Sequence, residues 1–228
     1  MVKLVSVGLE APPDFPVDRY NECHRVAEER RASHAEMDEF RGAWNAVAYR
    51  FQAMTEAGDA FANTLEKYGA HPPPKERYEQ ESYLSTFFSS GFATFESAFY
   101  GLYALGGMVN GSPLSLATAK DKQSVSPSRV HTAFSKAFAG DSSLAAIDAI
   151  LNDIEFKTFR ETRNILTHRT APGRTMYVGI GGDKDLPTEW KLNNMPLDKT
   201  IATQGRSHVA RLLTAIVDTC TDFGTRML

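Results

Sequence analysis

Apolar residues recur at intervals of three and four along much of the chain, the spacing that places them on one face of an α-helix. Residues 17–68 contain no proline and few glycines, which predicts one long helix, or two helices separated near Gly58. The segment is followed by three consecutive prolines at residues 72–74, and proline cannot continue a helix. The apolar stripe that faces the core is made of Trp44, Val47, Phe51 and Met54.

The next helix is predicted over residues 77–105 and is apolar around most of its circumference. Such a helix belongs in the middle of a bundle. We expect the glycine pair at 106–107 to end it, because glycine is a poor helix former. The same spacing predicts a short helix over residues 127–139, a third principal helix over 143–168 and a fourth over 197–226.

A different period follows the third principal helix. Short β-like runs at residues 175–180 and 189–192 flank a turn rich in glycine and aspartate, which predicts a small β-hairpin inserted near 175–192. We therefore expect an all-α fold, an up-and-down bundle of four principal helices with one hairpin insertion.

The chain has 228 residues, a length that suits one domain with a sizeable core. We expect a single domain over residues 1–228, with a long N-terminal helix over 17–68 and a core bundle over 76–228. The chain has 25 lysines and arginines and 28 aspartates and glutamates, so its formal net charge is −3. This balance does not favour a nucleic-acid partner for the protein as a whole, so such a partner requires a local basic patch.

Cys23 and Cys220 lie far apart in the sequence and belong to no Cys-x-x-Cys or Cys/His cluster. They predict reduced thiols in a cytosolic protein rather than a disulfide scaffold or a zinc site. The longest apolar stretch, residues 83–109, contains Glu96, and a carboxylate at the centre of a bilayer is costly. We therefore expect a buried helix there, a cytoplasmic location without membrane contact, and neither a metal nor a cofactor.

The charge is not spread evenly along the chain. Residues 156–175 contain five basic residues and one acidic residue, a local charge of +4. The acidic residue is Glu161, and the basic residues are Lys157, Arg160, Arg163, Arg169 and Arg174. This segment is the local basic patch that the overall composition conceals.

Helical geometry gathers the polar side chains of this segment on one face. At about 100° per residue they share an arc of about 140°, and most apolar side chains fall on the opposite arc. The members of the polar arc are Arg160, Arg163, Asn164, Thr167 and His168. Glu155 and Phe156 do not fit this separation, which indicates that the helix bends or starts anew near Asp153.

An arginine beside a histidine suits phosphodiester chemistry. A guanidinium matches phosphate oxygens, and an imidazole gives or takes a proton near neutral pH. One group stabilises charge while the other moves protons, as cleavage without a metal requires. The alternative is structural, because cations near a helix C-terminus favour the helix dipole and His168 is then an ordinary residue of the last turn.

The run Arg-Asn-Ile-Leu-Thr-His, from Arg163 to His168, resembles the motif of the HEPN superfamily (higher eukaryotes and prokaryotes nucleotide-binding), in which a histidine follows an arginine at a short fixed spacing. Asn164 matches the polar residue often found directly after that arginine. Glu96 resembles an acidic position on an earlier core helix of the superfamily. We expect Glu96 to contact Arg163 or a neighbour; a buried carboxylate held by a tyrosine or another arginine is the alternative.

The resemblance implies a metal-independent endoribonuclease in which the RNA 2′-hydroxyl attacks the adjacent phosphate. His168 would transfer protons, Arg163 would hold the scissile phosphate and Asn164 would orient the site. Domains of this superfamily commonly pair, so two copies of the motif would face each other across a homodimer interface. Flanking phosphates of the RNA are expected to contact Arg160, Arg169 and Arg174.

A toxin or defence effector, silenced by an antitoxin partner, is the biological role that such an activity suggests. Two other functions stay open from the sequence. Many HEPN domains are inactive and bind a nucleotide or a partner protein. A helical bundle outside the superfamily would use the same basic face for an acidic partner.

Overall fold

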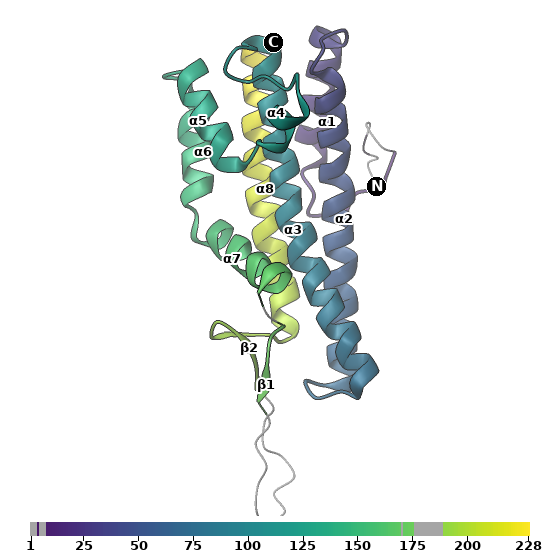
Figure 1. Ribbon diagram of the computed structural model, residues 1–228. Coiled ribbons are helices and arrows are strands. Elements are labelled where there is room, and N and C mark those ends of the chain that lie inside the picture. Colours follow the sequence, from purple (N-terminus) through teal and green to yellow (C-terminus); the bar gives the residue numbers. More distant parts are fainter. Residues whose placement is uncertain (1–3, 5–7, 170, 176–188) are drawn as a thin grey trace, which may run out of the picture.

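The computed structural model describes residue 4 and residues 8–169, 171–175 and 189–228. Within these residues the chain forms eight helices and three short strands (Figure 1). The elements are α1 (Val17–Arg31), α2 (Met37–Tyr68), α3 (Pro74–Val109), α4 (Ala119–Gln123), α5 (Pro127–Ala137), α6 (Ser142–Asn152), α7 (Ile154–His168), β1 (Arg174–Thr175), β2 (Glu189–Leu192), β3 (Met195–Pro196) and α8 (Lys199–Met227). Helices α1, α2, α3 and α8 lie side by side, and α5, α6 and α7 flank them (Figure 1). The predicted all-α bundle with a small hairpin is confirmed.

The N-terminal helical segment is divided, but not where the sequence suggested. Helix α1 ends at Arg31 and α2 begins at Met37, whereas Gly58 lies inside α2. A Cβ atom on Gly58 would stand 3.0 Å from the ring of Phe87. The prediction of a break at Gly58 is therefore wrong, because this glycine allows α3 to approach α2 closely and does not end the helix.

Helix α3 is longer at both ends than expected. It begins at Pro74, in the first turn, where the missing N–H of proline costs nothing. It continues through Gly106 and Gly107 to Val109, so the expectation that the glycine pair ends it is also wrong. A Cβ atom on Gly106 would stand 2.9 Å from the ring of Phe134, which shows that tight packing, and not termination, requires a glycine there.

The apolar segment of residues 83–109 is the central helix of the bundle. Its fully or almost fully buried phenylalanines are Phe87, Phe88, Phe92, Phe95 and Phe99. Burial of each such ring stabilises the fold by about 1.5–3 kcal/mol. Nowhere in the described part of the chain is a helix both long and apolar enough to cross a membrane.

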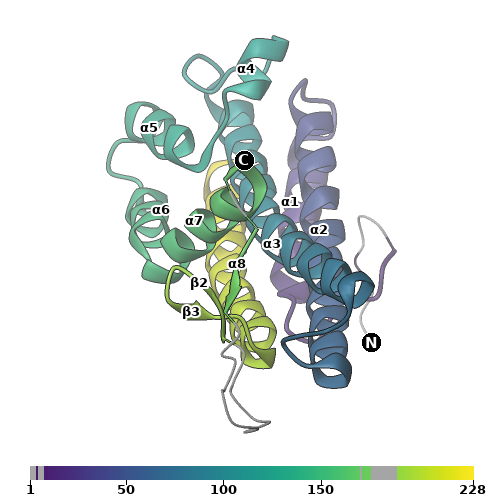
Figure 2. The same cartoon turned by 60° about the horizontal axis from the view of Figure 1, so that its bottom comes forward.

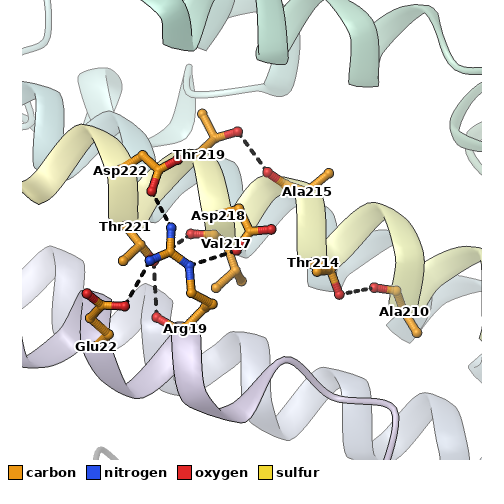
Figure 3. A network of polar contacts seen from close by, with 10 residues as sticks. All are labelled: Arg19, Glu22, Ala210, Thr214, Ala215, Val217, Asp218, Thr219, Thr221 and Asp222. Atoms are coloured by element: carbon orange, nitrogen blue, oxygen red, sulfur yellow. Dashed lines mark hydrogen bonds and ion pairs between the residues drawn. The ribbon is translucent and has the colours of Figure 1, made fainter.

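Helices α1 and α8 are joined by a polar seam centred on Arg19 (Figure 3). Its guanidinium donates to Glu22 at 2.8 Å, to Asp218 at 2.9 Å and also to Asp222. The Thr221 hydroxyl donates to the backbone carbonyl of Arg19 at 3.0 Å. One arginine on α1 thus holds two carboxylates of α8, which fixes how the two helices align.

The third principal helix of the sequence analysis is two helices, α6 and α7. Asp153 separates them with an extended backbone (ψ 134°), and its carboxylate caps the new helix. The restart near Asp153 was indicated by the sequence and is confirmed. It turns α7 away from α6 and across α3, so that Phe156 and Phe159 enter the aromatic core, with Phe159 4.7 Å from Phe88 between ring centroids.

The strands form a small antiparallel sheet in the order β1-β2-β3. Arg174 pairs with Trp190, and β2 turns into β3 through Asn193 and Asn194, both with positive φ. The expected run at 189–192 is a strand, whereas β3 was not foreseen. Of the expected run at 175–180, only Thr175 is among the described residues.

Candidate functional site

Helix α7 carries the candidate site, and Asp153 determines where it begins. The Asp153 carboxylate accepts hydrogen bonds from the backbone N–H groups of Glu155 at 2.8 Å and Phe156 at 3.3 Å. This is an N-cap, which satisfies N–H groups that have no partner inside the helix. The face of α7 that packs into the core consists of Phe156, Phe159, Thr162 and Ile165. The opposite face is left at the surface.

Arg163 lies at the edge of the packed face and is held by two residues of α3. Its Nη2 atom donates to Oε1 of Glu96 at 2.9 Å. Its guanidinium carbon lies 4.5 Å from the centre of the Phe92 ring, a cation–π distance. The side chain of Arg163 is 21% exposed and that of Glu96 44%. The expected contact between Glu96 and Arg163 is therefore present, and it fixes a guanidinium whose edge still reaches solvent.

Asn164 and His168 accompany Arg163 on the surface side of the helix. Asn164 is half-buried, and His168 is exposed in the last turn of α7. Neither side chain has a hydrogen-bond or ion-pair partner among the residues that the structure describes. An imidazole without a partner is available to exchange protons with a ligand. The structure thus brings Arg163, Asn164 and His168 to one side of α7 without direct contact between the arginine and the histidine.

The other basic residues of α7, and Arg169 directly after it, differ in how their charge is balanced. Arg160 is exposed and has no ion-pair partner in the described residues, and Lys157 donates to the Asn152 side chain at 3.1 Å. Arg169 donates from Nη1 to Oε1 of Glu161 at 2.7 Å. Both residues of that last pair are half or more exposed, so the pair is weak and easily exchanged for another partner.

Arg174 does not lie on the surface where the sequence analysis expected it. Its side chain is 2% exposed, its guanidinium lies 3.9 Å from the ring centre of Trp190, and Nη2 donates to Oε1 of Gln80 at 3.1 Å. Burial lowers the pKa of Arg174, although Glu81 opposes this shift. This arginine fastens the base of the hairpin to α3 and is not placed to contact a flanking phosphate of an RNA, which corrects the expectation.

The basic patch is therefore smaller than the sequence count of +4 indicated. Glu96 compensates Arg163 from outside the segment, and Arg174 is buried, whereas Glu161, which pairs with Arg169, is already included in the +4. In the described structure, the exposed cations of α7 without a carboxylate partner are Lys157 and Arg160. Sequence counting missed this because the compensating and burying residues come from α3 and β2.

A groove of about 490 Å³ between α2 and α3 opens beside Glu96. On its wall Arg50 donates to the carbonyl of Ala93 at 3.0 Å and also to the Ser97 hydroxyl. Tyr100 donates to Glu39 at 2.7 Å, and burial together with this bond raises the pKa of the tyrosine. Arg50 and Tyr100 were not singled out from the sequence, because no motif links them to residues of α7.

No group of three or more histidine, cysteine, aspartate or glutamate side chains within the described ranges is arranged to hold a metal ion. Comparisons with protein-family models, with curated proteins and with solved structures find no match for this chain. The geometry of α7 and α3 is therefore the basis for a functional proposal.

Proposed function

We propose that the surface side of α7 binds RNA and that the protein is a HEPN-like, metal-independent endoribonuclease. The observation that carries the proposal is the contrast between Arg163 and His168. Arg163 is positioned by Glu96 and Phe92, whereas His168, five residues further on, has no partner in the described residues. A fixed cation beside a free imidazole supplies charge stabilisation and proton transfer together.

In the proposed reaction the 2′-hydroxyl of a ribose attacks the adjacent phosphorus atom, and the bond from phosphorus to the 5′-oxygen of the next nucleotide breaks. The products are a 2′,3′-cyclic phosphate and a free 5′-hydroxyl. One proton leaves the attacking hydroxyl and one joins the leaving oxygen. His168 performs one transfer, Arg163 stabilises the extra negative charge on the phosphate oxygens, and Asn164 orients the bound group.

A homodimer with the motif at its interface would complete the proton balance. One neutral imidazole accepts the proton of the 2′-hydroxyl, and a second, protonated imidazole donates to the leaving oxygen. Two copies of His168 facing each other across a two-fold axis would provide both. Arg160 and Arg169 would then lie beside the cleft and contact flanking phosphates, which makes RNA binding weaken as salt concentration rises.

Cleavage of cellular RNA is the activity of a growth-arresting toxin or a defence effector. In that role the protein acts in the cytoplasm and is kept silent by an antitoxin partner. Glu96 and the groove beside it are the surface that such a partner would cover to block access to Arg163.

A non-catalytic module that binds a nucleotide or a partner protein is the second candidate. It is favoured by one observation, the compensation of the Arg163 charge by Glu96. An arginine already paired with a carboxylate offers less charge to a phosphate than a free one. The two candidates differ in the role of His168, which is essential for cleavage and dispensable for binding.

The test compares wild type with His168→Ala and Arg163→Ala in cleavage of single-stranded RNA in the presence of EDTA. His131→Ala on α5 and Arg25→Ala on α1 serve as matched controls away from α7. We expect His168→Ala to reduce cleavage by about 10²–10⁴-fold with little loss of RNA binding. Arg163→Ala should reduce both cleavage and RNA binding. The two control variants should match wild type in both measurements.

Mass spectrometry of the products should show the cyclic phosphate, and light scattering should show a dimer. Unchanged cleavage by both site variants would remove the proposal. Binding of RNA or nucleotide by wild type without cleavage of any RNA would instead favour the non-catalytic module.

A further inference from the structure

A pocket of about 370 Å³ is lined by residues of α7, β3 and the first turns of α8, together with the buried ring of Phe88 on α3. Figure 2 shows α7, β3 and α8 close to one another. This volume is at the small end of the range of about 300–1,000 Å³ for ligand pockets. The pocket uses the first turn and a half of α7, from Ile154 to Phe159, whereas the candidate site occupies the last turn and a half. It is a separate feature and does not depend on the ribonuclease proposal.

The inner part of the pocket is apolar. Two rings, Phe88 and Phe159, lie 4.7 Å apart between centroids, and Ile201 and Met195 contribute aliphatic surface. Such walls bind an apolar body by removing its surface from water. The faces of the two rings also carry negative potential, which favours a cation close to them.

The outer part of the pocket carries two carboxylates. Glu155 accepts a hydrogen bond from Nη2 of Arg211 at 2.5 Å, and its Oε1 lies 2.9 Å from Nε2 of His208. Asp198 caps α8 by accepting from the backbone N–H of Thr200 at 2.8 Å. Among the described lining residues there is no lysine or arginine. Arg211 and His208 compensate Glu155, whereas Asp198 has no ion-pair partner in the described residues, so the lining favours a cation over an anion.

His208 is the partner of Glu155 that a ligand can replace. Its imidazole is 41% exposed and stands on α8 at the mouth of the pocket, so it can turn into solvent without loss of core packing. Arg211 would remain, because it also donates to Asp153 at 2.8 Å. Gln204 and Thr158 also line the pocket and carry an amide and a hydroxyl.

We propose that this pocket binds a small organic cation, a protonated amine on a compact apolar body. The ammonium group takes the place of His208 on the Glu155 carboxylate. The apolar body lies against Phe88, Phe159 and Ile201. Charge complementarity at Glu155 selects this class over anions, and the apolar walls select it over polar neutral molecules.

The test uses three probes of the same shape and different charge: 2-phenylethylamine, 2-phenylethanol and phenylacetate. Isothermal titration calorimetry on the full chain at neutral pH should show the amine binding about tenfold or more tightly than the alcohol. Phenylacetate should not bind. Equal or tighter binding of phenylacetate, or no binding of the amine at concentrations up to about 10 mM, would overturn the proposal.

Substitutions of Glu155 and of its partner Arg211 should shift the affinity for the amine in opposite directions. Glu155→Gln should weaken amine binding about tenfold and leave alcohol binding unchanged. Arg211→Ala removes a competing cation from the same carboxylate and should tighten amine binding. Opposite shifts separate a direct anchor from a general loss of stability, which would weaken binding in both variants. Amine affinity that is the same in Glu155→Gln as in wild type would contradict the assignment of Glu155.

Thr158→Trp tests the location, because Thr158 is exposed on α7 and a large ring there fills the pocket without disturbing the core. It should abolish binding of both the amine and the alcohol, with an unchanged far-ultraviolet spectrum. Ile154 is 74% exposed at the rim. The competing occupant of the pocket is a second copy of the chain. In that case the wild type dimerises and does not bind the amine, and binding appears only when Ile154→Ser disrupts the dimer. This result would overturn the proposal.

Discussion

Arg163 on α7 donates to Glu96 on α3 at 2.9 Å, and the same guanidinium lies over the ring of Phe92, four residues before Glu96. One turn of α3 thus provides both a charged and an aromatic partner. Arg163 and Glu96 are 67 residues apart in the sequence, so their contact ties the C-terminal half of α7 to the central helix of the bundle.

The contribution of this pair to stability should be measurable but small, because both side chains are partly exposed. A double-mutant cycle with Arg163→Ala and Glu96→Gln should give a coupling free energy of about 0.5–1 kcal/mol in urea unfolding. The matched control is the more exposed pair Arg169 and Glu161, for which we expect about 0–0.5 kcal/mol. Equal coupling in the two cycles would show that the lower exposure of Arg163 does not strengthen its ion pair.

Gly91 should be intolerant of a side chain. A Cβ atom there would stand 2.6 Å from the Phe159 ring and 3.0 Å from the sulfur of Met54. We expect Gly91→Ala to destabilise the protein by about 1–3 kcal/mol by pushing α7 away from α3. Gly42→Ala is the control, since a Cβ atom at this exposed position of α2 would meet nothing within 4 Å. It should stabilise the helix by about 0.5–1 kcal/mol, and thermal unfolding of both variants checks the contrast.

Asp153 should make stability depend on acid pH. Burial alone would raise the pKa of its carboxyl, but hydrogen bonds from Arg211 and from the backbone of Glu155 and Phe156 together hold the pKa below its ordinary value of 3.8. A depressed pKa stabilises the fold above the unfolded value, and this stabilisation is lost as pH falls through the folded value.

Asp153→Asn retains an N-cap oxygen and removes the charge. At pH 7 it should be less stable than wild type by about 1 kcal/mol, and the difference should vanish at a pH well below 3.8. Urea unfolding at both pH values measures this. A difference that persists in acid would show that the cap geometry, and not the charge, is what the aspartate contributes.

The two cysteines should be unreactive in the folded protein. Cys23 and Cys220 are fully buried, and burial raises the pKa of both thiols well above the ordinary value. The thiolate is the reactive form, so an aromatic disulfide reagent at pH 8 should label neither cysteine until denaturant is added. Ser135→Cys on exposed α5 is the positive control and should react at once. Rapid labelling of the wild type would mean that α1 opens away from α8.

The sequence allowed the helical bundle, the restart at Asp153 and the contact between Glu96 and Arg163 to be predicted. The bundle follows from the periodicity of apolar residues, and the restart from the misfit of Glu155 and Phe156 with the polar and apolar arcs. The Glu96 contact follows from the resemblance of this residue to an acidic position of the HEPN superfamily. The breaks expected at Gly58 and at Gly106–Gly107 were wrong, because the need for glycine there comes from rings on other helices. The helix propensity of a residue carries no information about how closely a ring on another helix approaches it.

Arg174 shows the same limit within the candidate site. Its position in a basic segment suggested exposure. Its side chain is instead enclosed by Trp190, sixteen residues later in the chain, and by Gln80, which lies far earlier. The pocket beside Glu155 could not be predicted either, because its walls come from four separate elements. Groups that lie on one helix can be predicted from the sequence, whereas sites with walls from several elements exist only once the chain has folded.

The place of α8 in the bundle has a consequence for biosynthesis. It contacts α1, α2, α3, α6 and α7, so the core remains incomplete until this helix is made. The roughly 120 residues between the end of α3 and the end of α8 take on the order of 10 s to synthesise at about 5–20 residues per second. During that interval the phenylalanines of α3 can pack on α2 but lack the partners that α7 and α8 supply, so a chaperone that covers apolar helices would protect them from aggregation.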